Sequence, residues 1–80
     1  MLTVYSKNNC PYCVQAKQLL ESKGVAYTEV NIEHDPDARQ MLLDQGLRSV
    51  PQIFHGYEIL PGGFQGLAKQ SQEFFNKLKG

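Results

Sequence analysis

Turn and capping residues divide this 80-residue sequence into short segments of two alternating kinds. Short runs of β-branched and aromatic residues alternate with stretches in which apolar residues recur every three or four positions. Their order is strand, helix, strand, helix, strand, strand, helix. We expect a parallel pair across the first helix and an antiparallel hairpin at the later strands. The sequence thus predicts one α/β domain over residues 1–80, with a small four-stranded mixed sheet and three helices.

The strands are indicated by short runs that turn residues bound on both sides. The first run covers residues 2–6 and the second covers residues 26–32. The third and fourth runs, residues 51–54 and 57–60, flank His55-Gly56 and are typical of a β-hairpin.

Two of the helices open in the same way, with a capping residue followed by proline at the first helical position. Cys10-Pro11 opens a helix that ends before Gly24, and Asp35-Pro36 opens one that ends before Gly46. The final helix follows Gly62-Gly63. Its predicted stripe consists of Phe64, Leu67, Ser71, Phe74, Phe75 and Leu78.

The only two cysteines, Cys10 and Cys13, are separated by Pro11 and Tyr12. No secretory signal or membrane-spanning run is recognisable, so we expect a cytoplasmic protein. Disulfides in the reducing cytosol mainly serve catalysis or sensing, and a structural bridge across so short a loop adds little stability. Two cysteines that merely pack in the core, or that form half of a metal site, are the other interpretations. The spacing favours redox-active thiols.

The position of Pro11 makes Cys10 the N-cap residue and puts Cys13 one turn further along the same helix face. Exposed N–H groups and the helix dipole favour a thiolate at an N-cap. We therefore expect an exposed Cys10 whose pKa lies below the free-cysteine value of about 8.5, and a more buried Cys13 with a higher pKa. Cys10 is the predicted nucleophile and Cys13 the predicted resolving thiol.

The segment KNNCPYC resembles the Lys-x-x-Cys-Pro-Tyr-Cys signature of the dithiol glutaredoxins. SVPQIF, and GGF followed by a helix, are similar to that family's downstream pattern in the same order. The resemblance implies a thioredoxin fold with a cis peptide bond before Pro51. It also implies a glutathione-dependent thiol–disulfide oxidoreductase that reduces protein disulfides and glutathione mixed disulfides by a dithiol mechanism.

The resemblance further implies a groove for glutathione beside the cysteines. In such a groove Val50 offers backbone groups to the peptide of glutathione or substrate, Lys7 lies near the glycyl carboxylate, and Tyr12 borders the opening. The start of the final helix faces the γ-glutamyl end. The implied binding residues are Lys7, Tyr12, Val50, Pro51, Gly63, Phe64 and Gln65.

The start of the final helix departs from the family pattern. The family commonly has one or two aspartates after the double glycine, whereas this chain has Phe64-Gln65-Gly66. Gln65 cannot ion-pair with the γ-glutamyl ammonium, so we expect weaker glutathione binding and a more apolar rim. This departure supports a second interpretation, a glutaredoxin-like electron donor to ribonucleotide reductase that thioredoxin reductase recharges.

A metal or iron–sulfur binding module is a third interpretation. His34 and His55 are twenty-one positions apart, unlike the paired ligands of a zinc finger, and solvated loop histidines are the simpler interpretation. In iron–sulfur glutaredoxins the residue after the first cysteine is typically not proline, whereas Pro11 occupies that position. We therefore expect no metal.

The charges predict what kinds of partner the protein has. Eight basic and eight acidic residues give a formal net charge of zero, which provides no field for nucleic acid or anionic membranes. We expect a monomer that acts on glutathione and on disulfide-containing or glutathionylated proteins. Most of the acidic residues of the middle segment are predicted to form a solvated rim without acid–base function, namely Glu29, Glu33, Asp35 and Asp37.

Overall fold

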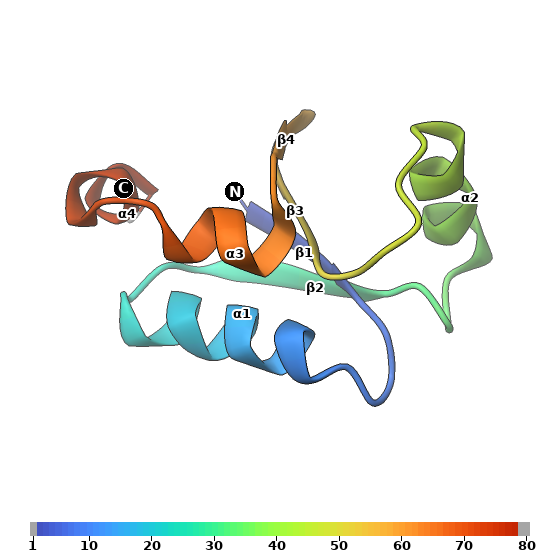
Figure 1. The fold of residues 1–80 in the computed structure, drawn as a ribbon, viewed down its shortest axis with the longest axis horizontal. Helices are drawn as coiled ribbons and strands as arrows, with labels where there is room; N and C mark the ends of the chain where they lie inside the picture. Colours follow the sequence, from blue (N-terminus) through green and yellow to red (C-terminus); the bar gives the residue numbers. More distant parts are fainter. Residues whose placement is uncertain (1, 79–80) are drawn as a thin grey trace.

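The computed structural model describes residues 2–78 of the chain. Figure 1 shows the order of its elements. They are β1 (Leu2–Ser6), α1 (Pro11–Ser22), β2 (Tyr27–Asn31), α2 (Pro36–Asp44), β3 (Gln52–His55), β4 (Glu58–Leu60), α3 (Gly63–Ala68) and α4 (Gln72–Leu78).

The four strands form one mixed sheet in the order β2-β1-β3-β4. β1 pairs with β2 in parallel, and the β1–β3 and β3–β4 pairs are antiparallel. The predicted parallel pair and hairpin are therefore confirmed. The hairpin turn lies one residue later than predicted, because His55 still pairs with Glu58 and Gly56 adopts the left-handed conformation, with φ of 62°.

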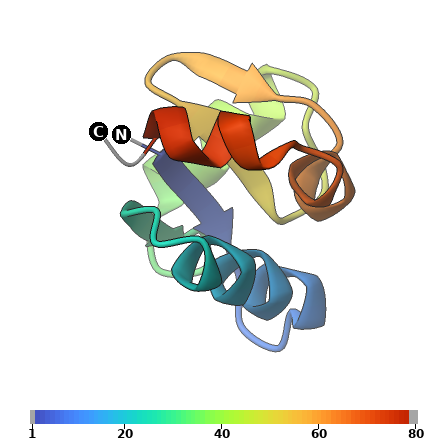
Figure 2. The same cartoon turned by 90° about the vertical axis from the view of Figure 1, so that its left-hand side faces the viewer.

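The main core lies on the sheet face that carries Leu2 and Val4 of β1. α1 and α3 pack against each other over this face, as Figures 1 and 2 show. α2 lies at the opposite end of the molecule from α4 (Figure 1). The buried cluster consists of Leu2, Val4, Ala16, Leu20, Val25, Ile53, Leu67 and Phe75.

The predicted capping of the first two helices is confirmed. The Asp35 side chain accepts a hydrogen bond from the Ala38 N–H at 3.0 Å, with Pro36 at the first helical position. Gly24 and Gly46 follow the helix ends with φ of 70° and 76°, a conformation that glycine adopts without steric penalty.

The single final helix predicted from the apolar stripe is wrong in one respect: the structure has two short helices, α3 and α4, in its place. Ser71 is the physical reason. Its hydroxyl accepts the N–H of Phe74 at 3.3 Å, which is how a serine caps a new helix. Ser71 is exposed and lies between the helices, whereas Leu67 and Phe75 are buried in the core as expected.

The double glycine lets the start of α3 lie close to the loop before β3. Gly62 and Gly63 have φ of 91° and 56°, and a Cβ at Gly63 would lie 2.7 Å from the carbonyl oxygen of Pro51. The Val50–Pro51 peptide bond is cis, as the resemblance implied. These two segments form opposite walls of the groove described below.

Candidate active site

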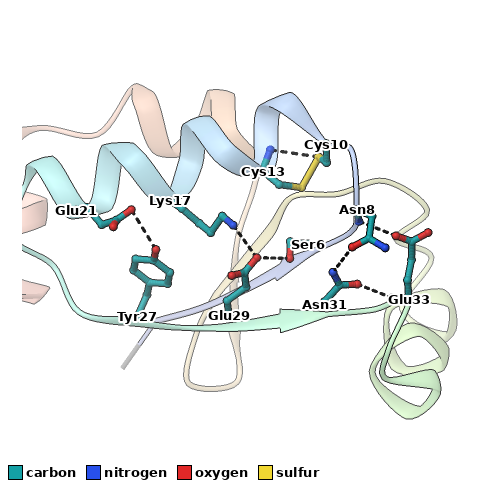
Figure 3. Close-up of polar contacts among 10 residues, drawn as sticks. All are labelled: Ser6, Asn8, Cys10, Cys13, Lys17, Glu21, Tyr27, Glu29, Asn31 and Glu33. Atoms are coloured by element: carbon teal, nitrogen blue, oxygen red, sulfur yellow. Dashed lines mark hydrogen bonds and ion pairs between the residues drawn. A yellow bond between two sulfur atoms is a disulfide. The ribbon is translucent and has the colours of Figure 1, made fainter.

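Cys10 is the N-cap of α1. Its φ of −119° and ψ of 97° are extended, Pro11 begins the helix, and its Sγ accepts a hydrogen bond from the Cys13 N–H at 3.2 Å. The first turn thus donates an N–H directly to the sulfur, which favours the thiolate when the cysteine is reduced. Cys10 and Cys13 form a disulfide, with their Cα atoms 5.2 Å apart (Figure 3).

The predicted exposure of Cys10 is wrong in degree. Cys10 is 7% exposed and Cys13 is 1% exposed, so both are buried and only their order agrees with the prediction. The disulfide covers one side of the Cys10 sulfur. The carbonyl oxygen of Val50 lies 3.9 Å from Cys10 Sγ and covers a second side. This contact is not a hydrogen bond in the disulfide form, because the disulfide sulfur has no proton. A substrate sulfur therefore reaches Cys10 from the sides that these two groups leave open.

A groove of about 510 Å³ lies between the loop before β3 and the start of α3. All the predicted binding residues except Lys7 line it. The Tyr12 ring, whose residue is 55% exposed, lies 5.9 Å from the Phe64 ring and forms an aromatic wall with it. Among the described residues that line this groove, none has a charged side chain. The groove is therefore suited to a neutral or apolar segment of substrate.

Lys7 lies in an adjoining opening of about 270 Å³, together with Arg39, Arg48 and Glu33. This opening shares Val50 and its neighbours with the groove, so the two form a continuous surface. Within residues 2–78, no carboxylate lies at ion-pair distance from the three cations. This arrangement of cations is suited to an anionic group.

Glu29 and Glu33, predicted to lie in a solvated rim, are exposed as expected, and each also has structural partners. Glu29 of β2 accepts hydrogen bonds from Ser6 Oγ at 2.7 Å and from Lys17 Nζ at 2.8 Å (Figure 3). These bonds, that from Lys17 first, hold the pKa of the Glu29 carboxyl below its usual value. The same carboxylate raises the pKa of the Lys17 ammonium, so both groups stay charged at neutral pH.

Glu33 fixes the loop that precedes the cysteines. Its carboxylate accepts the Asn8 N–H at 2.6 Å, and the Asn31 amide donates to Asn8 Oδ1 at 2.9 Å (Figure 3). Asn9, the next residue, has φ of 54°, a conformation that asparagine tolerates better than most side chains. The loop that delivers Cys10 is therefore held to the end of β2.

The predicted site residues lie close together, and the structure places four further charged residues beside them. Arg39 and Arg48 join Lys7 in its opening, and Lys17 and Glu29 lie beside the cysteines. The spacing of Lys17, four residues after Cys13 on one helix, is the signal that was available for it. Of the two histidines of the metal interpretation, His34 lies in the turn after β2 and His55 lies at the end of β3, and both are exposed.

Among residues 2–78, no three histidine, cysteine or acidic residues are grouped so that they could hold a metal ion. None of the helices in this range has the length and apolar character needed to cross a membrane.

Known proteins show the same sequence pattern and the same fold. A family model described as Glutaredoxin matches residues 2–59. A glutaredoxin of Neisseria meningitidis is 43% identical over 74 residues, which cover 90% of this chain and 86% of that protein.

Two solved structures are similar over 96% of this chain. The glutaredoxin-like protein NrdH-redoxin from Escherichia coli, described as having a thioredoxin-like activity profile, has 27% identity, a TM-score of 0.74 and 92% of its chain covered. A buckwheat glutaredoxin in complex with glutathione has 28% identity, a TM-score of 0.72 and 71% of its chain covered. These similarities confirm the thioredoxin fold predicted from the sequence.

Proposed function

Because this chain belongs to the glutaredoxin family of disulfide oxidoreductases, we propose that glutathione supplies its electrons and that it works by a dithiol mechanism. Its substrates are protein disulfides and glutathione mixed disulfides. Cys10 is the nucleophile and Cys13 the resolving thiol, since Cys10 is the N-cap and the less buried of the two. The order of burial and the N–H bond to Cys10 support these roles.

The cationic opening is the observation that carries the glutathione proposal. Glutathione has two carboxylates, and the opening places Lys7, Arg39 and Arg48 beside Val50, at the edge of the uncharged groove. A glycyl carboxylate bound there extends the tripeptide past Val50 toward Cys10. The buckwheat relative that was solved with glutathione adds support from a similar fold.

The reaction consists of thiol–disulfide exchanges. The Cys10 thiolate attacks a substrate disulfide, the substrate S–S bond breaks, and the departing sulfur takes up a proton. The Cys13 thiolate then attacks Cys10 and releases the second substrate thiol. Two glutathione molecules afterwards reduce the Cys10–Cys13 disulfide and leave as glutathione disulfide. Where the mixed disulfide joins Cys10 to glutathione, a second glutathione thiolate can instead attack the bound glutathione sulfur, which frees the Cys10 thiolate and gives glutathione disulfide. Glutaredoxin potentials of about −200 to −230 mV are within reach of the cytosolic glutathione pool.

The choice of reductant is tested by NADPH-coupled turnover of a glutathionylated substrate. We expect glutathione with glutathione reductase to sustain a higher rate than thioredoxin reductase without glutathione. The Cys10→Ser variant is the blank for both assays. A faster direct reduction of the Cys10–Cys13 disulfide by thioredoxin reductase would contradict the proposal.

A second prediction concerns Gln65, which is exposed at the start of α3. Gln65→Asp should strengthen glutathione binding by up to about 1 kcal/mol, roughly fivefold, because a carboxylate pairs with the γ-glutamyl ammonium while solvent screens the pair. The measurement is the glutathione dependence of the rate at low and high salt, and the gain should shrink at high salt.

Two controls make the Gln65 result specific. Gln18→Asp adds the same carboxylate at an exposed position of α1 that lines none of the three openings, so it should leave the glutathione dependence unchanged. Turnover driven by dithiothreitol lacks a γ-glutamyl group and should not respond. If Gln65→Asp changes both reductants equally, glutathione does not extend to the start of α3.

The second candidate function is a redoxin recharged by thioredoxin reductase that donates electrons to ribonucleotide reductase. The uncharged groove favours it, because neither Gln65 nor any other described lining residue offers a carboxylate to the ammonium of glutathione. The similarity to NrdH-redoxin, with its thioredoxin-like activity profile, points the same way. The comparison of the two reductants decides between the candidates.

A further inference from the structure

We infer that Lys17 and Glu29 form a pair of opposed positioning residues for the resolving step, in which Lys17 promotes and Glu29 restrains the attack by Cys13. The inference depends on the proposed roles of Cys10 and Cys13. It does not depend on whether glutathione or thioredoxin reductase supplies the electrons.

The geometry places this ion pair at the same opening as the resolving cysteine. Lys17 follows Cys13 by four residues on α1, so the two side chains are neighbours on one helix face. A third, shallow opening of about 600 Å³ is lined by both cysteines together with Lys17 and Glu29. Figure 3 shows the Glu29 and Ser6 side chains extending from the sheet toward α1 below the disulfide.

The Lys17–Glu29 pair is held in place by Ser6 of β1. Ser6 is 1% exposed, and its hydroxyl donates to the same Glu29 oxygen that accepts from Lys17. Within residues 2–78, Lys17–Glu29 is the only ion pair, with side-chain exposures of 25% and 37%. A buried serine anchor thus holds a partly exposed charge pair in a fixed position at this opening.

Few other charges face the resolving sulfur. Of the charged residues that line the opening, Lys7 is the only one besides the pair, and it comes from the loop after β1. α3 packs against α1 and contributes none, since its described sequence is the uncharged GFQGLA. Lys17 and Glu29 are therefore the two charges of opposite sign that the fold brings to this position.

The chemistry of the step explains why charge matters here. Cys13 is almost fully buried, and burial disfavours a thiolate. To resolve a mixed disulfide, the Cys13 thiol gives its proton to solvent and its sulfur bonds to Cys10. The bond from Cys10 to the substrate sulfur breaks, and that sulfur leaves with the electron pair and takes up a proton. The two cysteines are oxidised and the substrate is reduced. Because the thiolate is the attacking form, the Lys17 cation increases the fraction of Cys13 that is ready to attack.

The test measures the resolving step with an uncharged probe. Reduced protein is mixed with 2,2′-dithiodipyridine in a stopped-flow instrument, where Cys10 releases one thiopyridone and Cys13 then releases the second. At neutral pH we expect Lys17→Gln to slow the second phase about threefold and Glu29→Gln to accelerate it about threefold. A tenfold change in the thiolate fraction of Cys13 changes the rate only about threefold, because the nucleophilicity of a thiolate falls as its pKa falls.

The opposite signs distinguish this role from a merely structural one. Both substitutions break the same ion pair, so both should lower the unfolding temperature slightly, and a structural role would move both rates in the same direction. Lys17→Arg keeps the cation and should restore the rate. Both rate changes should shrink at high salt.

A matched control and two contrary outcomes complete the experiment. Glu21→Gln removes a carboxylate of α1 that accepts a hydrogen bond from a β2 side chain, Tyr27, but Glu21 lies two turns beyond Cys13, so the second phase should stay nearly unchanged. Equal slowing in Lys17→Gln and Glu29→Gln, or no change in either, would overturn the inference. A second phase that survives in Cys13→Ser would instead contradict the proposed role of Cys13.

Discussion

Replacing Cys10 by serine is expected to abolish all turnover, whereas replacing Cys13 by serine should remove only one of two activities. Serine is itself a good N-cap, so Cys10→Ser keeps the start of α1 and loses only the nucleophile. Cys13→Ser keeps the Cys10 thiolate, and glutathione can take the place of the missing resolving thiol. Removal of glutathione from mixed disulfides should therefore persist, while reduction of protein disulfides should fall to the blank rate.

Two assays on the same preparations check this expectation. One follows the release of glutathione from a glutathionylated peptide, and the other follows the reduction of an intramolecular protein disulfide. Circular dichroism before and after each assay confirms that the variants are folded. The opposite pattern, with Cys10→Ser active and Cys13→Ser inactive, would exchange the two roles. Equal loss of both activities in the two variants would show that neither cysteine acts without the other.

The structure around the cysteines was predictable because it depends on local sequence. Proline after Cys10 determines the first helical position, and from it follow the N-cap and the N–H bond of Cys13 to the sulfur. The capped second helix at Asp35 and the parallel strand pair were predictable for the same reason. Capping residues and short-range periodicity carry that information in consecutive residues.

The features that were missed depend on how distant segments pair. Glu29 lies beneath α1 because the parallel register puts it opposite Val4, whose side chain faces the core. No local sequence pattern distinguishes Glu29 from other exposed strand residues. The cationic opening likewise combines α2 and the loop before β3 with Lys7. The break between α3 and α4 was missed because Ser71 falls on the apolar period but caps a helix with its hydroxyl.

Gly66→Ala is expected to destabilise the protein by about 2 kcal/mol, the direction opposite to that expected from helix propensity. Gly66 lies inside α3, where alanine is ordinarily favoured over glycine by about 1 kcal/mol. A Cβ at this position, however, would overlap the Pro61 carbonyl oxygen and lie 2.9 Å from the Pro61 carbonyl carbon. Both atoms belong to backbone, and Gly66 N–H also donates to the Gly62 carbonyl at 3.1 Å, so little room for adjustment exists.

Thermal unfolding measures this effect against a matched glycine. At about 4 to 8 °C per kcal/mol for a domain of this size, Gly66→Ala should lower the midpoint by roughly 8 to 16 °C. Gly46→Ala is the control for strain without overlap, because Gly46 has φ of 76° and nothing within 4 Å of its Cβ position, and about 1 kcal/mol is expected there.

The same substitution connects stability to the groove, because Pro61 and Gly62 line it. A displaced Pro61 carbonyl would change the shape of this wall, so Gly66→Ala should also weaken glutathione binding, measured as the glutathione dependence of the rate below the unfolding temperature. An acidic residue at position 66, where the family pattern allows one, would overlap the same carbonyl, so its absence follows from packing. If Gly66→Ala unfolds at or above the wild-type temperature, Pro61 is free to move and the close packing of Gly66 does not fix the groove.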